Sequence, residues 1–216
     1  MNPQQKKEAK SLFDSVKRGM RKLRGVEVVA CPPFAFLASL VSDKKVKLGA
    51  QDIFWEDKGA FTGEVSASML KDLRVEYVLV GHSERRKYQK ETDVIINKKI
   101  KAALGKGLKV VLCIDKISQL RQGLKGISKK ELKAIVLAYE PLFAIGTGKA
   151  CSPERAKKMR LSMKKALRKN NRILYGGSVN SQNAASYIKE AGFNGLLVGG
   201  ASLKPKEFLG IVKNVS

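Results

Sequence analysis

The sequence is poor in acidic side chains, aromatic side chains and histidine. Its 216 residues contain 19 Asp and Glu against 43 Lys and Arg, which gives a formal net charge of +24, and aromatic residues make up only 6%. So basic a balance raises nucleic-acid binding as a hypothesis. The basic residues are spread along the chain, however, without zinc-finger spacing, an aromatic RNA-binding platform or a basic tail. We therefore prefer a solvated basic surface, with lysines such as Lys98, Lys99 and Lys101 on polar helix faces.

Cysteine and long apolar runs are also scarce. Cys31, Cys113 and Cys151 are far apart and odd in number, and neither CxxC spacing nor a His/Cys cluster occurs, so we expect neither a disulfide framework nor a metal site. No apolar run approaches the length that crosses a membrane. The first 25 residues carry many lysines and arginines, so we expect no secretory signal and a cytoplasmic location.

Short apolar segments alternate along the whole chain with amphipathic ones. We expect strands at 26–30, 46–50, 77–81, 110–113, 135–139, 173–175 and 195–198. We expect helices at 5–24, 34–41, 66–73, 92–104, 153–169, 183–190 and 205–212, with Val94, Ile95 and Leu104 facing inward. This alternation predicts an α/β fold with a parallel sheet and right-handed crossovers, in a single domain over residues 1–216.

A doubly wound sheet and a (β/α) barrel both fit this alternation. Polar motifs recur at the carboxyl end of nearly every expected strand. A barrel brings all those ends to one mouth, whereas an open sheet spreads them along an edge. The recurrence therefore favours a barrel.

Glu140 ends an apolar run that is typical of a strand buried on both faces. Pro141 follows at once, and then a short loop with glycines at 146 and 148. A carboxylate at the end of a buried strand, followed by a hinged glycine loop, suggests a general base under a lid. On this stretch alone, a strand-end acid before an ordinary turn explains the pattern equally well.

His82 is the only histidine and follows the expected strand 77–81, directly before a helix start at Ser83. A lone histidine is more often structural or exposed than catalytic. At this position, however, the helix N-terminus disfavours an imidazolium, and a neutral imidazole can polarise a carbonyl group.

Two glycine turns follow the last two expected strands, Gly176-Gly177-Ser178 and Gly199-Gly200. Such turns let backbone N–H groups approach an anion closely, and this pair lies where barrels commonly bind phosphate. Either turn alone is weak evidence. Together with Glu140 and His82, these turns suit the transfer of a proton next to the carbonyl of a small phosphorylated sugar.

At this point the chain resembles the triosephosphate isomerase family of the bacterial and eukaryotic type. The matching motifs are Gly49–Asp52, Gly59–Glu64, Gly81–Arg86, Ala138–Lys149, Leu174–Val179 and Leu197–Pro205. The resemblance implies a (β/α)₈ barrel that interconverts dihydroxyacetone phosphate and glyceraldehyde 3-phosphate without a cofactor or metal, through a carboxylate base and a neutral histidine. It also implies a cytoplasmic homodimer whose small-molecule partner is a phosphorylated triose. It implies no association with a membrane or with nucleic acid.

Residue by residue, the resemblance makes Glu140 the base and His82 the electrophile. It assigns backbone N–H groups of Gly146, Ser178, Gly199 and Gly200 to the phosphate, residues 141–149 to the lid, Tyr175 to its latch, Glu84 to a carboxylate beside the site, and Thr62 to a loop inserted into a dimer partner.

The chain also departs from the family pattern. The family opens with a strand ending in Asn-x-Lys-Met-Asn, and this chain begins Met1-Asn2, inside that motif. We therefore expect seven strands, a gap between strands 26–30 and 195–198, and no catalytic lysine. A start codon assigned too late would give the same beginning. Leu142 and Phe143 replace the usual valine and tryptophan of the lid, and Asp115 stands near the usual Gly-Glu.

From these departures we expect weak activity and a weakened dimer. The alternative is a catalytically impaired barrel that binds nucleic acid or another polyanion through its basic surface.

Overall fold

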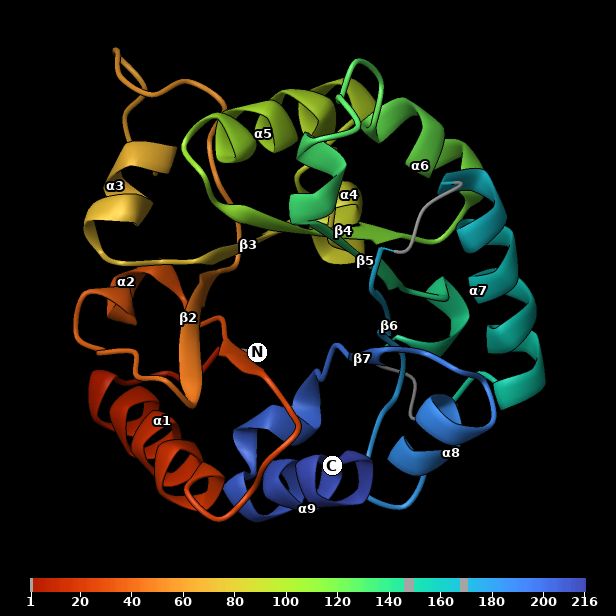
Figure 1. Cartoon of the computed structure of the whole chain (residues 1–216). Helices are drawn as coiled ribbons and strands as arrows, with labels where there is room; N and C mark the ends of the chain where they lie inside the picture. Colours follow the sequence, from red (N-terminus) through yellow and green to blue (C-terminus); the bar gives the residue numbers. More distant parts are fainter. Residues whose placement is uncertain (1, 146–149, 168–170) are drawn as a thin grey trace.

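A computed structural model describes residues 2–145, 150–167 and 171–216, and its strands lie around a common centre with helices outside them (Figure 1). The strands in the described residues are β1 (Val28–Ala30), β2 (Val46–Ala50), β3 (Tyr77–Val80), β4 (Lys109–Ile114), β5 (Ile135–Tyr139), β6 (Ile173–Tyr175) and β7 (Gly195–Leu196). All seven expected strands are therefore present, and the ends of β1, β3, β4 and β7 differ by one or two residues from the expected ones.

The seven strands form one sheet in sequence order, and every neighbouring pair is parallel. The sheet curls as a barrel does, with β1 and β7 as its two ends (Figure 1). No backbone pairing joins β1 to β7 within the described residues. The expected TIM-type parallel fold is confirmed, and the expected gap lies between these two strands.

Helices alternate with the strands and form the outer layer. They are α1 (Lys6–Met20), α2 (Phe34–Leu37), α3 (Ala67–Asp72), α4 (Ser83–Tyr88), α5 (Asp93–Gly105), α6 (Ile117–Gly123), α7 (Pro153–Leu167), α8 (Ala184–Lys189) and α9 (Pro205–Val215), with 3₁₀ turns η1 (Glu131–Ala134), η2 (Leu142–Ala144) and η3 (Gly200–Leu203). Helices α1 and α9 pack together, so the outer layer continues past the two end strands (Figure 1).

Side-chain caps explain where several helices begin. The hydroxyls of Ser66, Thr92 and Ser152 accept hydrogen bonds from the backbone N–H groups of Met69, Ile95 and Arg155, which the first helical turn leaves unpaired. Among the described residues, no helix combines the length and the apolar character that crossing a membrane requires.

Strand β5 is buried along its whole length, as expected, and its side chains alternate between two environments. Val136 and Ala138 pack with the small cluster inside the barrel, whereas Leu137 and Tyr139 pack with the larger core under the helices. This alternation is the period of two of a β-strand. Glu140, the next residue, consequently faces the barrel interior on the side opposite to Tyr139.

Helix α5 corrects two expectations. Val94 is 67% exposed, so its predicted inward orientation was wrong, whereas Leu104 packs against the core as predicted. Ile96, Ile100 and Ala103 form the fully buried face of the helix. Lys99 was expected on a polar surface but is only 3% exposed. It lies on the same face as Ile96 and Ala103, and its ammonium bonds the carboxylates of Asp52 and Glu91. Burial of this lysine is possible because its charge is paired.

Candidate functional site

The carboxylate of Glu140 lies at the mouth of the barrel and is almost completely buried, with 2% of the residue exposed. Its backbone continues the parallel ladder, since its N–H donates to the carbonyl oxygen of Ile114 over 2.8 Å. One carboxylate oxygen accepts a hydrogen bond from the backbone N–H of Ser83 at 3.0 Å. The other lies 3.1 Å from Nε2 of His82. The ends of β3 and β5 thus bring together the two residues that the sequence singled out.

His82 is the N-cap of α4, and its side chain bridges that helix and Glu140. Its Nδ1 accepts a hydrogen bond from the backbone N–H of Glu84 at 3.3 Å. Because Nδ1 is an acceptor, the ring proton belongs on Nε2, which then donates to Glu140. The hydrogen-bond network therefore assigns a neutral imidazole with its N–H directed at the carboxylate.

Burial raises the pKa of Glu140 above the ordinary value for a glutamic acid. The proximity of His82, the Ser83 N–H and the thiol of Cys113 all act in the opposite direction and offset part of the effect. A carboxylate with a raised pKa is a stronger base once ionised, so this environment suits a group that removes a proton from carbon.

Glycines around the mouth make room for these groups. Gly81 has a φ of +74°, and a Cβ there would lie 3.0 Å from Nη2 of Arg86 and 3.3 Å from the carbonyl oxygen of Cys113. A Cβ on Gly176 would lie 3.1 Å from Cγ of Glu140, and one on Gly177 would lie 2.2 Å from the Tyr175 hydroxyl. The turn at Gly176-Gly177 therefore serves close packing as well as any approach to an anion.

Tyr175 holds the segment that follows the expected lid. Its hydroxyl accepts a hydrogen bond from the N–H of Cys151 at 3.1 Å, and its ring stacks on Tyr187 with 3.8 Å between centroids. The Tyr187 hydroxyl donates to the carbonyl oxygen of Cys151 at 2.5 Å. Both backbone groups of Cys151 are thus held by tyrosines, and burial raises the pKa of Tyr175, so its phenol stays protonated.

Ser178 reaches the other side of the expected lid. Its hydroxyl donates to the carbonyl oxygen of Ala144 in η2 at 2.7 Å. Gly199 and Gly200 are exposed at the start of η3, and a Cβ on either would meet no atom within 4 Å. Their backbone is therefore open to a ligand. Gly146 lies outside the described residues.

The remaining two expected residues lie further from the carboxylate. Glu84 has 63% of its side chain exposed, and its carboxylate is 3.8 Å from Nδ1 of His82. Thr62 is exposed on the loop between β2 and α3, which projects outward from the barrel (Figure 1). That loop carries an aromatic cluster, since the Phe54 ring lies 4.8 Å from Phe61 and 4.2 Å from Trp55.

Sequence reasoning missed three groups that complete this arrangement. They are the N–H of Ser83, the thiol of Cys113 and the Tyr187 side chain. Ser83 carried a helix-start signal, but nothing in the sequence showed that its N–H would meet Glu140. Cys113 and Tyr187 meet their partners through strand pairing and helix packing, which have no local signal.

The fold and the site together define the class: a parallel (β/α) barrel enzyme with a buried carboxylate–imidazole pair beside glycine turns at its mouth. The family model described as triosephosphate isomerase matches residues 1–215. The triosephosphate isomerase of Dictyoglomus thermophilum is 44% identical over 213 residues, covering 87% of this chain and 86% of the relative. That of Alkaliphilus oremlandii is 42% identical over 231 residues, covering 95% and 93%. This chain belongs to the triosephosphate isomerase family.

Proposed function

We propose that this protein is a triosephosphate isomerase that interconverts dihydroxyacetone phosphate and glyceraldehyde 3-phosphate. The observation that carries the proposal is the contact between the buried Glu140 carboxylate and Nε2 of the neutral His82, at 3.1 Å, in a chain of this family. The two isomers differ only in the position of two hydrogens. One is bound to carbon and one to oxygen, at C1 in dihydroxyacetone phosphate and at C2 in glyceraldehyde 3-phosphate. Moving a proton between these carbons through an enediolate requires a base and a group that stabilises the enediolate oxygens, and no cofactor.

In this proposal Glu140 removes the proton from one carbon and returns it to the other. His82 donates its Nε2–H to the substrate oxygens, where charge develops in the enediolate. For this the carboxylate leaves its contact with His82 when substrate enters. Backbone N–H groups of Ser178, Gly199 and Gly200 hold the phosphate, together with Gly146. Tyr175 holds the lid after its closure, and Glu84 supports His82 from the solvent side.

A coupled assay with purified protein tests the activity, starting from either triose phosphate. Turnover that disappears in Glu140→Gln supports the proposal. Absence of turnover in a folded protein, together with salt-sensitive nanomolar binding of DNA or RNA, would instead support the alternative of a polyanion-binding barrel. The family relationship does not favour that alternative.

We further propose that the chain forms one domain over residues 1–216 and acts as a cytoplasmic homodimer, with the loop around Thr62 inserted into a second copy. The exposed Phe61, at 42%, gives this loop an apolar surface that a partner would cover. Sedimentation of the native protein and of Phe61→Ser tests this association. A monomeric native protein with full activity would contradict the dimer and leave the activity intact.

A further inference from the structure

The connections between helices and strands differ in charge between the two ends of the barrel. In a parallel (β/α) barrel, the connections from a helix to the next strand lie at the amino ends of the strands, and those from a strand to the next helix lie at the carboxyl ends. The described helix-to-strand connections are 21–27, 38–45, 73–76, 106–108, 124–134, 171–172 and 190–194. They contain twelve basic and five acidic residues. We call the surface that they form the amino-end face.

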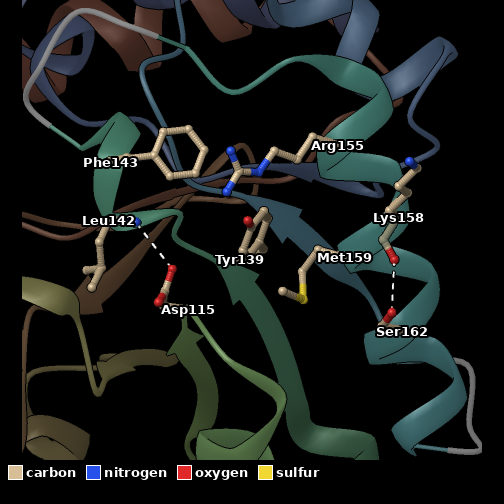
Figure 2. Close-up of a pocket in the computed structure, with 8 residues that line it drawn as sticks. All are labelled: Asp115, Tyr139, Leu142, Phe143, Arg155, Lys158, Met159 and Ser162. Atoms are coloured by element: carbon tan, nitrogen blue, oxygen red, sulfur yellow. Dashed lines mark hydrogen bonds between the residues drawn. The ribbon is translucent and has the colours of Figure 1, made fainter.

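The strand-to-helix connections at the opposite end have no excess of basic residues. Counted with α4, which lies between β3 and α5, they are 31–33, 51–66, 81–92, 115–116, 140–145, 150–152, 176–183 and 197–204. They contain seven basic and eight acidic residues. Figure 2 shows one cation beside this end, Arg155, which lies over the Phe143 ring and lines a cavity together with Tyr139 and the acidic Asp115. Among the described connections, the excess of positive charge is therefore confined to the amino-end face.

All twelve cations of the amino-end face are exposed, and three of its five acidic residues are paired with cations outside the connections. Asp43 lies 3.3 Å from the ammonium of Lys17. The carboxylates of Glu27 and Glu76 lie 3.3 and 3.2 Å from the ammonium of Lys47. Because Lys17 belongs to α1 and Lys47 to β2, neither is among the twelve. The face consequently keeps most of its positive charge for a partner in solution.

The amino ends of several strands meet around the hydroxyl of Tyr77, the first residue of β3. This hydroxyl donates a hydrogen bond to the carboxylate of Glu27, which directly precedes β1. It also lies 3.4 Å from Nζ of Lys109, at the start of β4, and 3.4 Å from Nη2 of Arg172, which directly precedes β6. These contacts hold the connections before β1, β3, β4 and β6 on one surface.

The composition of the amino-end face limits the kind of polyanion that it fits. Phe193 is the only aromatic residue in these connections and is 3% exposed, so the face offers no ring on which an unpaired base could stack. Val41 is its one large hydrophobic residue with a high exposure, whereas proteins that lie on a membrane insert a broad apolar face. Cations without aromatic or apolar neighbours suit a dense row of phosphates, which a nucleic-acid double helix provides.

We propose that the amino-end face binds the phosphate backbone of double-stranded nucleic acid, without reading its bases. The candidate site lies at the other end of the barrel, so both ends can be occupied at once. The binding depends on no step of the isomerase reaction, and it is measured without triose phosphate. The dissociation constant at physiological salt should be about 10⁻⁴–10⁻⁶ M, as for binding to phosphates alone.

The experiment is fluorescence anisotropy of the full chain with a labelled DNA duplex, an RNA duplex and an unstructured single strand of equal length, from about 50 to about 200 mM salt. The face variant replaces by glutamine four lysines of the amino-end face that bond no other described side chain: Lys22, Lys44, Lys130 and Lys133. We expect it to bind the duplexes at least tenfold more weakly. The slope of log affinity against log salt should become shallower by about two or more.

The matched control replaces by glutamine four exposed lysines of the strand-to-helix connections, and so has the same net charge: Lys58, Lys87, Lys90 and Lys116. We expect it to weaken duplex binding less than threefold. Circular dichroism of each variant confirms that it is folded. Absence of duplex binding by the native protein at about 50 mM salt, or equal weakening by both variants, would overturn the proposal.

Two further ligands test the choice of partner. Tighter binding of the single strand than of either duplex would overturn the assignment to a double helix. Binding to phosphatidylserine vesicles without binding to the duplexes would overturn the choice of nucleic acid. Comparable affinity for the DNA and RNA duplexes is the result expected of contacts to phosphates alone.

Discussion

Two clusters of this protein bury carboxylates, and they differ in whether cations pair with the buried negative charge. At the barrel mouth, Glu140 has only a neutral imidazole, a backbone N–H and a thiol beside it. Under α5, Asp52 and Glu91 share the ammonium of Lys99 at 2.6–2.7 Å and the guanidinium of Arg85 at 2.7–2.8 Å. The first cluster leaves a negative charge without a cation, and the second pairs two carboxylates with two cations.

The pKa shifts of Glu140 and Glu91 follow from this difference, whereas that of Asp52 does not. Burial raises the pKa of Glu140, and His82, the Ser83 N–H and the Cys113 thiol offset only part of this effect. Burial also acts on Glu91, but Lys99 and Arg85 together hold its pKa below the ordinary value. Asp52 is buried more deeply, and there burial raises the pKa despite Lys99. A buried charge that is paired contributes to a defined structure, whereas one that is unpaired is available for proton transfer.

The largest expected effect is that of Glu140→Gln on turnover. Removal of the base should lower kcat about 10²–10⁴-fold with a smaller change in KM. The free energy of unfolding near neutral pH should rise or stay the same, because a buried uncompensated charge disappears. Kinetics and urea unfolding of the same preparation measure both quantities.

Glu140→Asp is the matched variant for position, since it keeps the charge and withdraws it by about one methylene. We expect at least a tenfold fall in kcat. Unchanged kcat in either variant would show that Glu140 is not the base.

Lys99→Met should lower the stability and leave turnover nearly unchanged, which is the opposite of what we expect for Glu140→Gln. It leaves Asp52 and Glu91 buried without their shared ammonium, so the free energy of unfolding should fall by about 3–5 kcal/mol. In the protein that remains folded, kcat should change little, because no side chain of the cluster is bonded to the Glu140 carboxylate or the His82 ring among the described residues. Lys98→Met is the control, since Lys98 is its exposed neighbour on α5. Equal destabilisation by both changes would contradict the role of the buried pairing.

His82→Gln separates the two members of the pair that we propose to be catalytic. The amide of glutamine keeps a hydrogen-bond donor, but it cannot place that donor where the imidazole does and cannot transfer a proton as the imidazole can. We expect kcat to fall about 10²–10³-fold, as when an oxyanion-stabilising donor is removed. Phosphate affinity should be nearly unchanged, because the glycine turns that we propose to bind the phosphate follow other strands. A raised KM with unchanged kcat would place His82 in binding alone.

The pH dependence of stability gives the smallest effect. The native state holds the proton of Glu140 more tightly than the unfolded chain does, since its pKa is raised above 4.5. Its contribution to stability is therefore full below 4.5 and is lost as pH rises through the raised native pKa. Glu140→Gln should lack this loss, and kcat/KM of the native enzyme should fall on acidification over the same interval. Parallel stability curves for the two proteins would contradict the shift.

The order of the elements and most residues of the candidate site could be predicted from the sequence. Seven apolar runs predicted the seven strands, because a buried parallel strand needs a continuous apolar stretch. Ser66 and Ser152 predicted helix starts, because a cap is a local interaction. Glu140, His82 and the glycine turns were recognised as polar motifs at strand ends. Local periodicity failed at Val94 and Lys99, whose orientation depends on what α5 packs against.

The sequence by itself determined the alternating α/β pattern, the position of each chemical group along the chain and the family to which it belongs. Only the tertiary structure decided that the Ser83 N–H and the Cys113 thiol meet Glu140, that Lys99 is buried, and that Tyr139 faces a cavity opposite the carboxylate. These facts depend on contacts between residues far apart in the chain. Burial and charge pairing, which set the pKa of Glu140, arise from those contacts and have no counterpart in any local stretch of sequence.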